Sequence, residues 1–125
     1  TVLCNYDKNK FNINIYIGCK KHQKDATTQE FRNYVDKMIN IVDMGDIDVI
    51  NLIRNDKIDI LIDLMGLISN HRLSLYKNRL APIQITWCGF QNTTGIKEMD
   101  YIINLFSKLI IQHLENQIEL LICRM

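Results

Sequence analysis

Residues 57–66 read KIDILIDLMG, and this stretch decides the fold class. Apolar side chains occupy most positions between Ile58 and Met65, and the run ends in a glycine. Such near-continuous apolar character predicts an inner strand of a parallel sheet that is covered on both faces. Gly66 then falls in the loop at the carboxyl end of that strand. The apolar positions are Ile58, Ile60, Leu61, Ile62 and Leu64.

Shorter stretches on both sides predict further strands. Residues 12–18, NINIYIG, alternate isoleucine with polar or aromatic residues, which is the period of a half-buried strand. Pro82, the only proline, opens a strand over residues 83–87, since proline disfavours helix in the residue before it. The MDYII sequence at 99–103 predicts the last strand.

Four helices are expected between and after these strands. Thr27 and Glu30 have the spacing of a capping box, and apolar residues follow at helical spacing. A second helix is predicted after Asp46, a third over residues 72–77, and a fourth over residues 106–125. The expected buried faces are Phe31, Tyr34, Val35, Met38 and Val42 in the first helix, Ile47, Ile50 and Ile53 in the second, and Leu109, Leu114, Ile118 and Leu121 among others in the fourth.

The order of these elements predicts an α/β fold, a Rossmann-like parallel sheet with flanking helices. The 125 residues suit a single domain, and 47% hydrophobic with 23% charged residues is an ordinary globular composition. An unrelated nucleotide-binding α/β domain is a weaker alternative. It would place phosphate-binding glycines directly after the first strand, where Gly18 stands alone.

Charge and cysteine content disfavour several kinds of partner. The formal net charge is +1 and the basic residues are scattered, so no nucleic-acid interface is expected. No run of about 18 apolar residues exists, so no membrane-spanning helix is predicted. The four cysteines lack C-x-x-C spacing and lie far from the histidines, so no metal site is expected. We expect these cysteines to be reduced and mostly buried.

Two loops lie where an open α/β sheet binds ligands, at the carboxyl ends of strands. They are residues 65–72, MGLISNHR, and residues 88–95, CGFQNTTG. In the second loop the glycines allow close approach of the backbone, and Thr93 and Thr94 offer hydroxyls to polar groups such as sugar oxygens. A tight turn without a ligand explains the same glycines equally well and is more frequent.

Several single residues have a functional and a structural interpretation. Arg72 suits an anion clamp or a surface cation, and His71 a base or a solvated loop residue. Trp87 most simply fills core beside the loop. Asp59 and Asp63 lie on one face of their strand, where they suit acid–base chemistry or, more simply, strand-edge carboxylates with polar partners.

The spacing of these motifs closely resembles the catalytic region of protein O-linked N-acetylglucosamine transferases and their plant relatives of the Spindly type. The family pattern runs from D-I-L-V-D-L-x-G through A-P-I-Q-x-x-W-L-G-Y-P-x-T-[ST]-G to M-D-Y. The resemblance extends to YDKNKFNINIYIG near one end and IELLICRM at the other. The matching residues of the central motifs are Ala81, Pro82, Ile83, Gln84, Trp87, Gly89, Thr93, Thr94, Gly95, Met99, Asp100 and Tyr101.

The resemblance implies that residues 1–125 are a partial N-terminal catalytic lobe of a two-lobed GT-B glycosyltransferase. Such an enzyme moves N-acetylglucosamine from UDP to Ser or Thr hydroxyls of cytoplasmic or nuclear proteins. Relatives of the Spindly type use GDP-fucose instead. No cofactor or metal is implied. The positions implied to line the cleft and the donor sugar are Gly66, Arg72, Cys88, Gly89, Thr93, Thr94 and Gly95.

The same resemblance implies that this chain holds no catalytic residue and is inactive alone. The family's proposed catalytic histidine, its second lobe and its tetratricopeptide repeats have no counterpart in the 125 residues. Departures from the family pattern support a different hypothesis, a degenerate lobe that acts as a binding or scaffold module. The departures are Leu67, Ile68, Gln91, Asn104 and Leu105.

Overall fold

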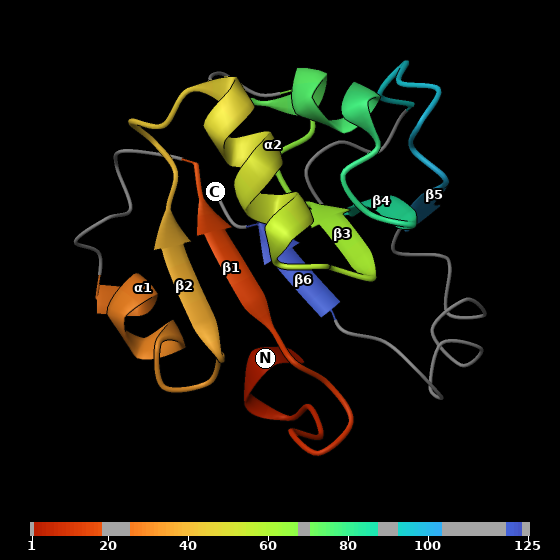
Figure 1. The fold of residues 1–125 in the computed structure, drawn as a ribbon. Helices are drawn as coiled ribbons and strands as arrows, with labels where there is room; N and C mark the ends of the chain where they lie inside the picture. The colour runs from red at the N-terminus through yellow and green to blue at the C-terminus, as the bar shows by residue number, and fades with distance from the viewer. Residues whose placement is uncertain (1, 19–25, 68–70, 88–92, 104–119, 124–125) are drawn as a thin grey trace.

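The computed structural model describes residues 2–18, 26–67, 71–87, 93–103 and 120–123 (Figure 1). Helices and strands alternate along most of this length. The elements, with η for a 3₁₀ helix, are η1 Val2–Cys4, β1 Asn14–Ile17, α1 Ala26–Phe31, β2 Lys37–Asn40, α2 Asp46–Asn55, β3 Ile60–Asp63, η3 Leu73–Asn78, β4 Ile83–Trp87, β5 Tyr101–Ile103 and β6 Leu120–Cys123.

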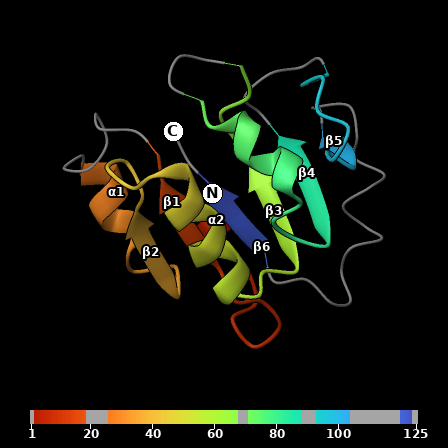
Figure 2. The same ribbon diagram turned by 45° about the horizontal axis from the view of Figure 1, so that its top comes forward.

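The strands form two hydrogen-bonded ladders, and every pairing is parallel. One ladder is β1–β2, and the other has the order β5-β4-β3-β6. Strand β6 also lies against β1, so the two ladders stand side by side (Figures 1 and 2). In Figure 2 the arrows of β2, β3, β4 and β6 point to the same side, which we call the carboxyl edge. The loops that follow β1 to β4 leave the sheet there.

Strand β3 confirms the expectation drawn from KIDILIDLMG. All four of its residues are buried, and its neighbours on both sides are strands. Leu61 packs into a core with α2 and η3, whereas Ile60 and Ile62 pack with Ile85 and Ile103 on the opposite face. The strand is apolar on both faces because it has a core on each side.

Helices cover the two faces of the sheet unequally. Helix α2 and η3 lie over one face, where Val49 and Ile53 of α2 are buried together with Tyr16 of β1. The opposite face of β1 carries Ile15, which packs with Phe31 of α1. The expected strands at 83–87 and 99–103, the helix after Asp46 and the short helical segment near 72–77 are all present.

The first predicted helix is wrong beyond Phe31. Helix α1 ends there, a turn follows, and Lys37–Asn40 form β2 in parallel register with β1. Four of the five residues that mimic helical spacing, Phe31, Tyr34, Val35 and Met38, do converge on one core, but they reach it from a helix, a turn and a strand. Val42 is not part of that core. The apolar residues are therefore spaced three to four apart because separate elements contribute to one core, and not because they belong to one continuous helix.

Three further expectations need correction. Residues 120–123 form β6, paired with β3, instead of continuing a tail helix, while the rest of that predicted helix lies outside the described residues. Ile47 was expected to face inward, yet its side chain is 73% exposed. It lies two residues before buried Val49, and this separation turns it to about the opposite side of the helix. Cys4 is exposed, contrary to the expectation of buried cysteines.

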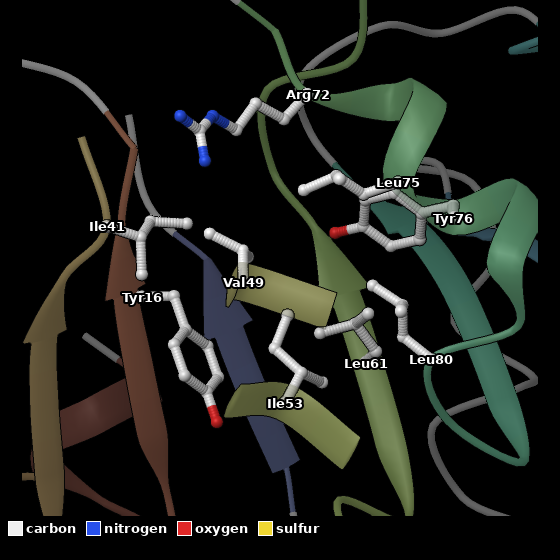
Figure 3. A pocket seen from close by; sticks show the side chains of 9 residues that line it. All are labelled: Tyr16, Ile41, Val49, Ile53, Leu61, Arg72, Leu75, Tyr76 and Leu80. Atoms are coloured by element: carbon white, nitrogen blue, oxygen red, sulfur yellow. The ribbon is translucent and has the colours of Figure 1, made fainter. Parts of the chain in front are cut away.

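A small pocket of about 30 Å³ lies between α2, η3 and the sheet (Figure 3). Its walls are mostly apolar and include Val49, Ile53, Leu61 and Leu75, with the Arg72 guanidinium above them. A void inside a packed core forfeits dispersion contacts of the atoms that line it. The pocket is thus a packing defect in this core.

Filling the pocket should stabilise the protein. We expect Val49→Ile to raise the free energy of unfolding by about 0.5–1 kcal/mol, since one added methylene enters existing space. Urea denaturation followed by fluorescence of Trp87 would measure it. Val35→Ile, in the core on the opposite face, serves as the control and should change stability by less than about 0.5 kcal/mol. Destabilisation by Val49→Ile would show that the pocket cannot accept the methylene.

Candidate functional site

The carboxyl end of β3 is built around the buried carboxylate of Asp63, whose residue is 4% exposed. One oxygen accepts a hydrogen bond from the backbone N–H of Met65 at 3.0 Å, and the other accepts one from Gly66 at 2.9 Å. The Thr86 hydroxyl on β4 donates to the same carboxylate at 3.1 Å. Three donors thus satisfy Asp63, which confirms the interpretation that it is a strand-edge carboxylate with polar partners. Asp59, by contrast, is exposed.

The turn that Asp63 organises places Gly66 at the carboxyl edge. Gly66 has a φ of +58°, a conformation that strongly favours glycine. Leu67 follows and is 46% exposed at this edge. The glycine is therefore required by the turn itself. Its predicted place in a cleft wall is compatible with that requirement and stays a prediction.

Arg72 acts as a strut between two loops of the carboxyl edge. Its guanidinium donates hydrogen bonds to the backbone carbonyls of Met44 at 2.8 Å and Val42 at 3.3 Å, both in the segment after β2. The Nη1 atom lies 3.9 Å from the Asp46 carboxylate at the start of α2 and is itself buried. These contacts explain why an arginine closes the core here (Figure 3). A contact with a donor sugar stays a prediction.

The two threonines of the second loop stabilise turns in the backbone. The Thr93 hydroxyl accepts a hydrogen bond from the Gly95 N–H, and the Thr94 hydroxyl accepts one from the Ile96 N–H. Gly95 is exposed with a φ of +69°, so any side chain there would be strained. Cys88 and Gly89 lie outside the described residues. The expectation that this loop lines a donor site stays a prediction.

The other single-residue expectations have simpler outcomes. His71 is exposed, and its Nδ1 accepts a long hydrogen bond of 3.4 Å from the Leu73 N–H at the start of η3. Trp87 is half-buried and packs against the core formed by Ile60, Ile62 and Ile85. His71 therefore sits at a helix start, and Trp87 fills core as expected.

Sequence reasoning missed a polar network at the amino edge of the sheet, at the start of β4. Gln84 is 0% exposed, and its side-chain oxygen accepts a hydrogen bond from the Leu80 N–H at 2.8 Å. Its side-chain nitrogen donates to the Tyr76 carbonyl at 2.9 Å and to the Glu98 carbonyl at 2.8 Å. The side-chain amide of Gln84 therefore has hydrogen-bond partners at both its oxygen and its nitrogen. The signal was a glutamine in a strand whose neighbouring residues on both sides, Ile83 and Ile85, are apolar.

Asp100 and Arg79 extend this network to the surface. Both guanidinium arms of Arg79 bind the Asp100 carboxylate, one of them at 2.8 Å. The Gln84 backbone N–H also donates to this carboxylate at 2.8 Å. We call the three residues Arg79, Gln84 and Asp100 the bracket. Arg79 has a φ of +46°, which is unusual for a residue other than glycine.

The bracket should make the free energy of unfolding depend on pH in the acidic range. Hydrogen bonding from Arg79 lowers the pKa of Asp100 more than partial burial raises it, and the Gln84 N–H lowers it further. A carboxyl whose pKa is depressed by folding contributes stability above its unfolded value, and that contribution is lost as the pH falls through the folded pKa. The advantage of the natural protein over Asp100→Asn should therefore be largest between about pH 5 and 7 and shrink below about pH 4.

Urea midpoints of both proteins across this pH range would measure the effect. Asp59→Asn, an exposed carboxylate at the same edge of the sheet, is the control and should show a small difference at every pH. A gap between Asp100→Asn and the natural protein that stays constant down to pH 2 would contradict the prediction.

Two negative observations apply to the described residues alone. Nowhere among them do three or more histidines, cysteines or acidic residues cluster closely enough to hold a metal ion. None of the helices within the described ranges has the length and apolarity needed to cross a membrane.

A comparison with protein families identifies the chain. The model for "Glycosyl transferase family 41" matches residues 4–117. The chain belongs to glycosyl transferase family 41. Family 41 relatives include proteins named probable UDP-N-acetylglucosamine–peptide N-acetylglucosaminyltransferase SPINDLY. The one from Hordeum vulgare is 40% identical over 103 residues, which cover 79% of this chain and 11% of the relative. The one from Arabidopsis thaliana is 38% identical over the same length and coverage.

A solved structure of a similar protein supports the fold. The O-GlcNAc transferase of Thermobaculum terrenum, solved as a mutant, matches with a TM-score of 0.65 and 26% identity over 77% of this chain and 24% of that chain. The predicted family and the predicted Rossmann-like sheet of a GT-B glycosyltransferase are confirmed. The chain spans about a tenth of the length of the curated relatives, 11% for those from Hordeum and Arabidopsis.

Proposed function

We propose that this chain forms part of the cleft wall of a protein O-glycosyltransferase that moves N-acetylglucosamine from UDP to Ser or Thr hydroxyls of cytoplasmic or nuclear proteins. The observation that carries the proposal is the family 41 match over residues 4–117. The names of the similar SPINDLY proteins supply the reaction class. GDP-fucose is the alternative donor.

In this reaction the acceptor hydroxyl attacks the anomeric carbon, the bond to the nucleotide diphosphate breaks, and the hydroxyl proton passes to a base. The negative charge that develops on the leaving diphosphate must be neutralised. Arg72 is the cation at the described carboxyl edge that suits this task by type, but backbone carbonyls already hold its guanidinium. We therefore assign the chain a shaping role, in which a second lobe and upstream residues of a longer protein supply the base and the cation.

The carboxyl edge supports this shaping role. Asp63 holds the turn that contains Gly66, and Arg72 ties the loop after β2 to the start of η3. Both sets of contacts keep backbone in place without a ligand: Asp63 through both carboxylate oxygens, and Arg72 through its Nη2 atom. Binding surfaces built on such fixed loops lose little entropy when a substrate arrives.

One observation favours the second candidate, a degenerate lobe that binds without catalysis. Leu67, one of the departures from the family pattern, presents an apolar side chain, 46% exposed, at the carboxyl edge. An apolar group at a sugar site supplies no hydrogen bond to a hydroxyl. The two functions predict opposite results in one experiment.

The experiment exchanges residues 4–117 of this chain into the Arabidopsis SPINDLY relative in place of its matching segment. The exchanged and unexchanged proteins would each receive radiolabelled UDP-N-acetylglucosamine or GDP-fucose with cytosolic acceptor proteins. Label on protein from either donor supports the transferase function. A folded exchanged protein that transfers neither sugar, beside an active unexchanged one, would contradict it in favour of the degenerate lobe.

A further inference from the structure

The connection between β4 and β5 raises a mechanical problem. The two strands are parallel neighbours, with Ile85 opposite Tyr101, so the chain must return from the carboxyl edge to the amino edge. Parallel strands usually make this return through a helix that packs on the sheet. The described part of the connection, residues 93–100, contains neither helix nor strand. Other contacts must hold it in place.

The bracket supplies those contacts at the end of the return. The Asp100 N–H donates to the Gln84 carbonyl at 2.8 Å, while the Gln84 N–H donates back to the Asp100 carboxylate. The Gln84 side chain binds the Glu98 carbonyl, and Arg79 binds the Asp100 carboxylate with both arms. The backbone at Glu98 and Asp100 is thereby fastened to the buried start of β4.

Gln84 is also hydrogen-bonded to the segment that precedes β4. Through Leu80 and Tyr76, Gln84 is bonded to the end of η3 and the segment behind it. Since Gln84 is completely buried, these bonds are shielded from competing water. The return segment is thus anchored to the core and not to another exposed loop.

The contacts of Gln84 with Glu98 and Asp100 also determine where the turn at Thr93–Gly95 lies. The hydroxyls of Thr93 and Thr94 bond to N–H groups two residues further on, which sets the shape of the turn. Ile96 and Met99, which follow, pack against the core under α2, and the Met99 N–H bonds the Ile96 carbonyl. The shape of the Thr93–Gly95 turn is therefore set by its own hydrogen bonds, whereas its position in the fold is set by residues 96–100.

We propose that Arg79, Gln84 and Asp100 are positioning residues that set the location of the Thr93–Gly95 turn relative to the rest of the cleft wall. They touch no substrate. The inference deepens the proposed function and, in its consequence for transfer, rests on it. It also gives a role to the A-P-I-Q and M-D-Y motifs, whose polar residues meet at the edge of the sheet opposite to the proposed cleft.

The anchor can be tested in the 125-residue chain without any enzyme assay. Amide hydrogen exchange of Asp100→Ala would be compared with that of Asp59→Ala, which removes an exposed carboxylate from the same edge. We expect exchange at Ile96 and Met99 to accelerate about tenfold more than exchange at the central β3 amides, because local opening is separable from global unfolding. Equal acceleration at all sites, or none at Ile96 and Met99, would overturn the proposal.

The effect on positioning needs the exchanged SPINDLY protein described above. We expect Asp100→Ala to lower the kcat/KM of the folded protein about tenfold or more, at a temperature well below its melting temperature. Arg79→Lys, which keeps the charge, should lower kcat/KM less than Arg79→Ala does, while Lys77→Asn in the neighbouring η3 should have no effect. Loss of activity only in proportion to loss of folded protein would overturn the positioning role. If the exchanged protein without these substitutions transfers no sugar, the proposed function fails, and amide exchange still decides whether the bracket is an anchor.

Discussion

Replacing Gln84 by methionine is expected to lower the free energy of unfolding by about 3–5 kcal/mol. Methionine has a similar length and volume, so the change removes polar atoms without opening a large cavity. Two backbone groups then lose the partners described above, the Leu80 N–H and the Glu98 carbonyl, while the Tyr76 carbonyl keeps only its hydrogen bond from the Arg79 N–H. Each unsatisfied buried group costs about 1–3 kcal/mol.

Urea denaturation monitored by Trp87 would measure this loss, because Trp87 is the only tryptophan and ends the same strand. The matched control is Gln29→Met, which alters an exposed glutamine of α1 and should change stability by less than about 0.5 kcal/mol. A loss below about 1 kcal/mol for Gln84→Met would mean that water or rearrangement satisfies the abandoned groups.

The second large effect is expected at Asp63. Asp63→Ala should lower the free energy of unfolding by about 3 kcal/mol or more, since the N–H groups of Met65 and Gly66 and the hydroxyl of Thr86 all lose their acceptor. Asp63→Asn keeps one carbonyl oxygen but turns an amide donor toward another donor, so its loss should be intermediate.

Asp59 provides an internal control on the same strand. It lies four residues earlier and is exposed, so Asp59→Ala should change stability by less than about 0.5 kcal/mol. Similar losses at the two positions would show that the carboxylate contacts of Asp63 contribute little. The same denaturation experiment decides between these outcomes.

The fold class was accessible from sequence wherever one strand or helix carried its own pattern. Residues 57–66 predicted β3 because a strand with a core on each face is apolar at almost every position. The helix after Asp46 and the strand after Pro82 were likewise predicted from local signals. These patterns are short-range, so they survive without knowledge of the rest of the fold.

Prediction failed where distant parts of the chain set the local structure. Phe31, Tyr34, Val35 and Met38 share one core. Their spacing alone could not show whether one helix carries them or whether a helix, a turn and a strand bring them together. Strand β6 depends on hydrogen bonds with β3, which lies almost sixty residues earlier. Pairing over such distances leaves no periodic signal in the short strand itself.

The candidate site likewise combines features that the local sequence predicts with contacts that depend on the fold. The sequence by itself determined the family, the α/β class and the two glycine-containing loops, because each is carried by residue types at fixed local spacing. Only the tertiary structure decided that Asp63 meets Thr86, that Arg72 supports the segment after β2, and that Gln84, Asp100 and Arg79 form one bracket. A buried polar side chain takes its role from the donors and acceptors that the fold brings within about 3 Å of it, and these come from elements far apart in the chain.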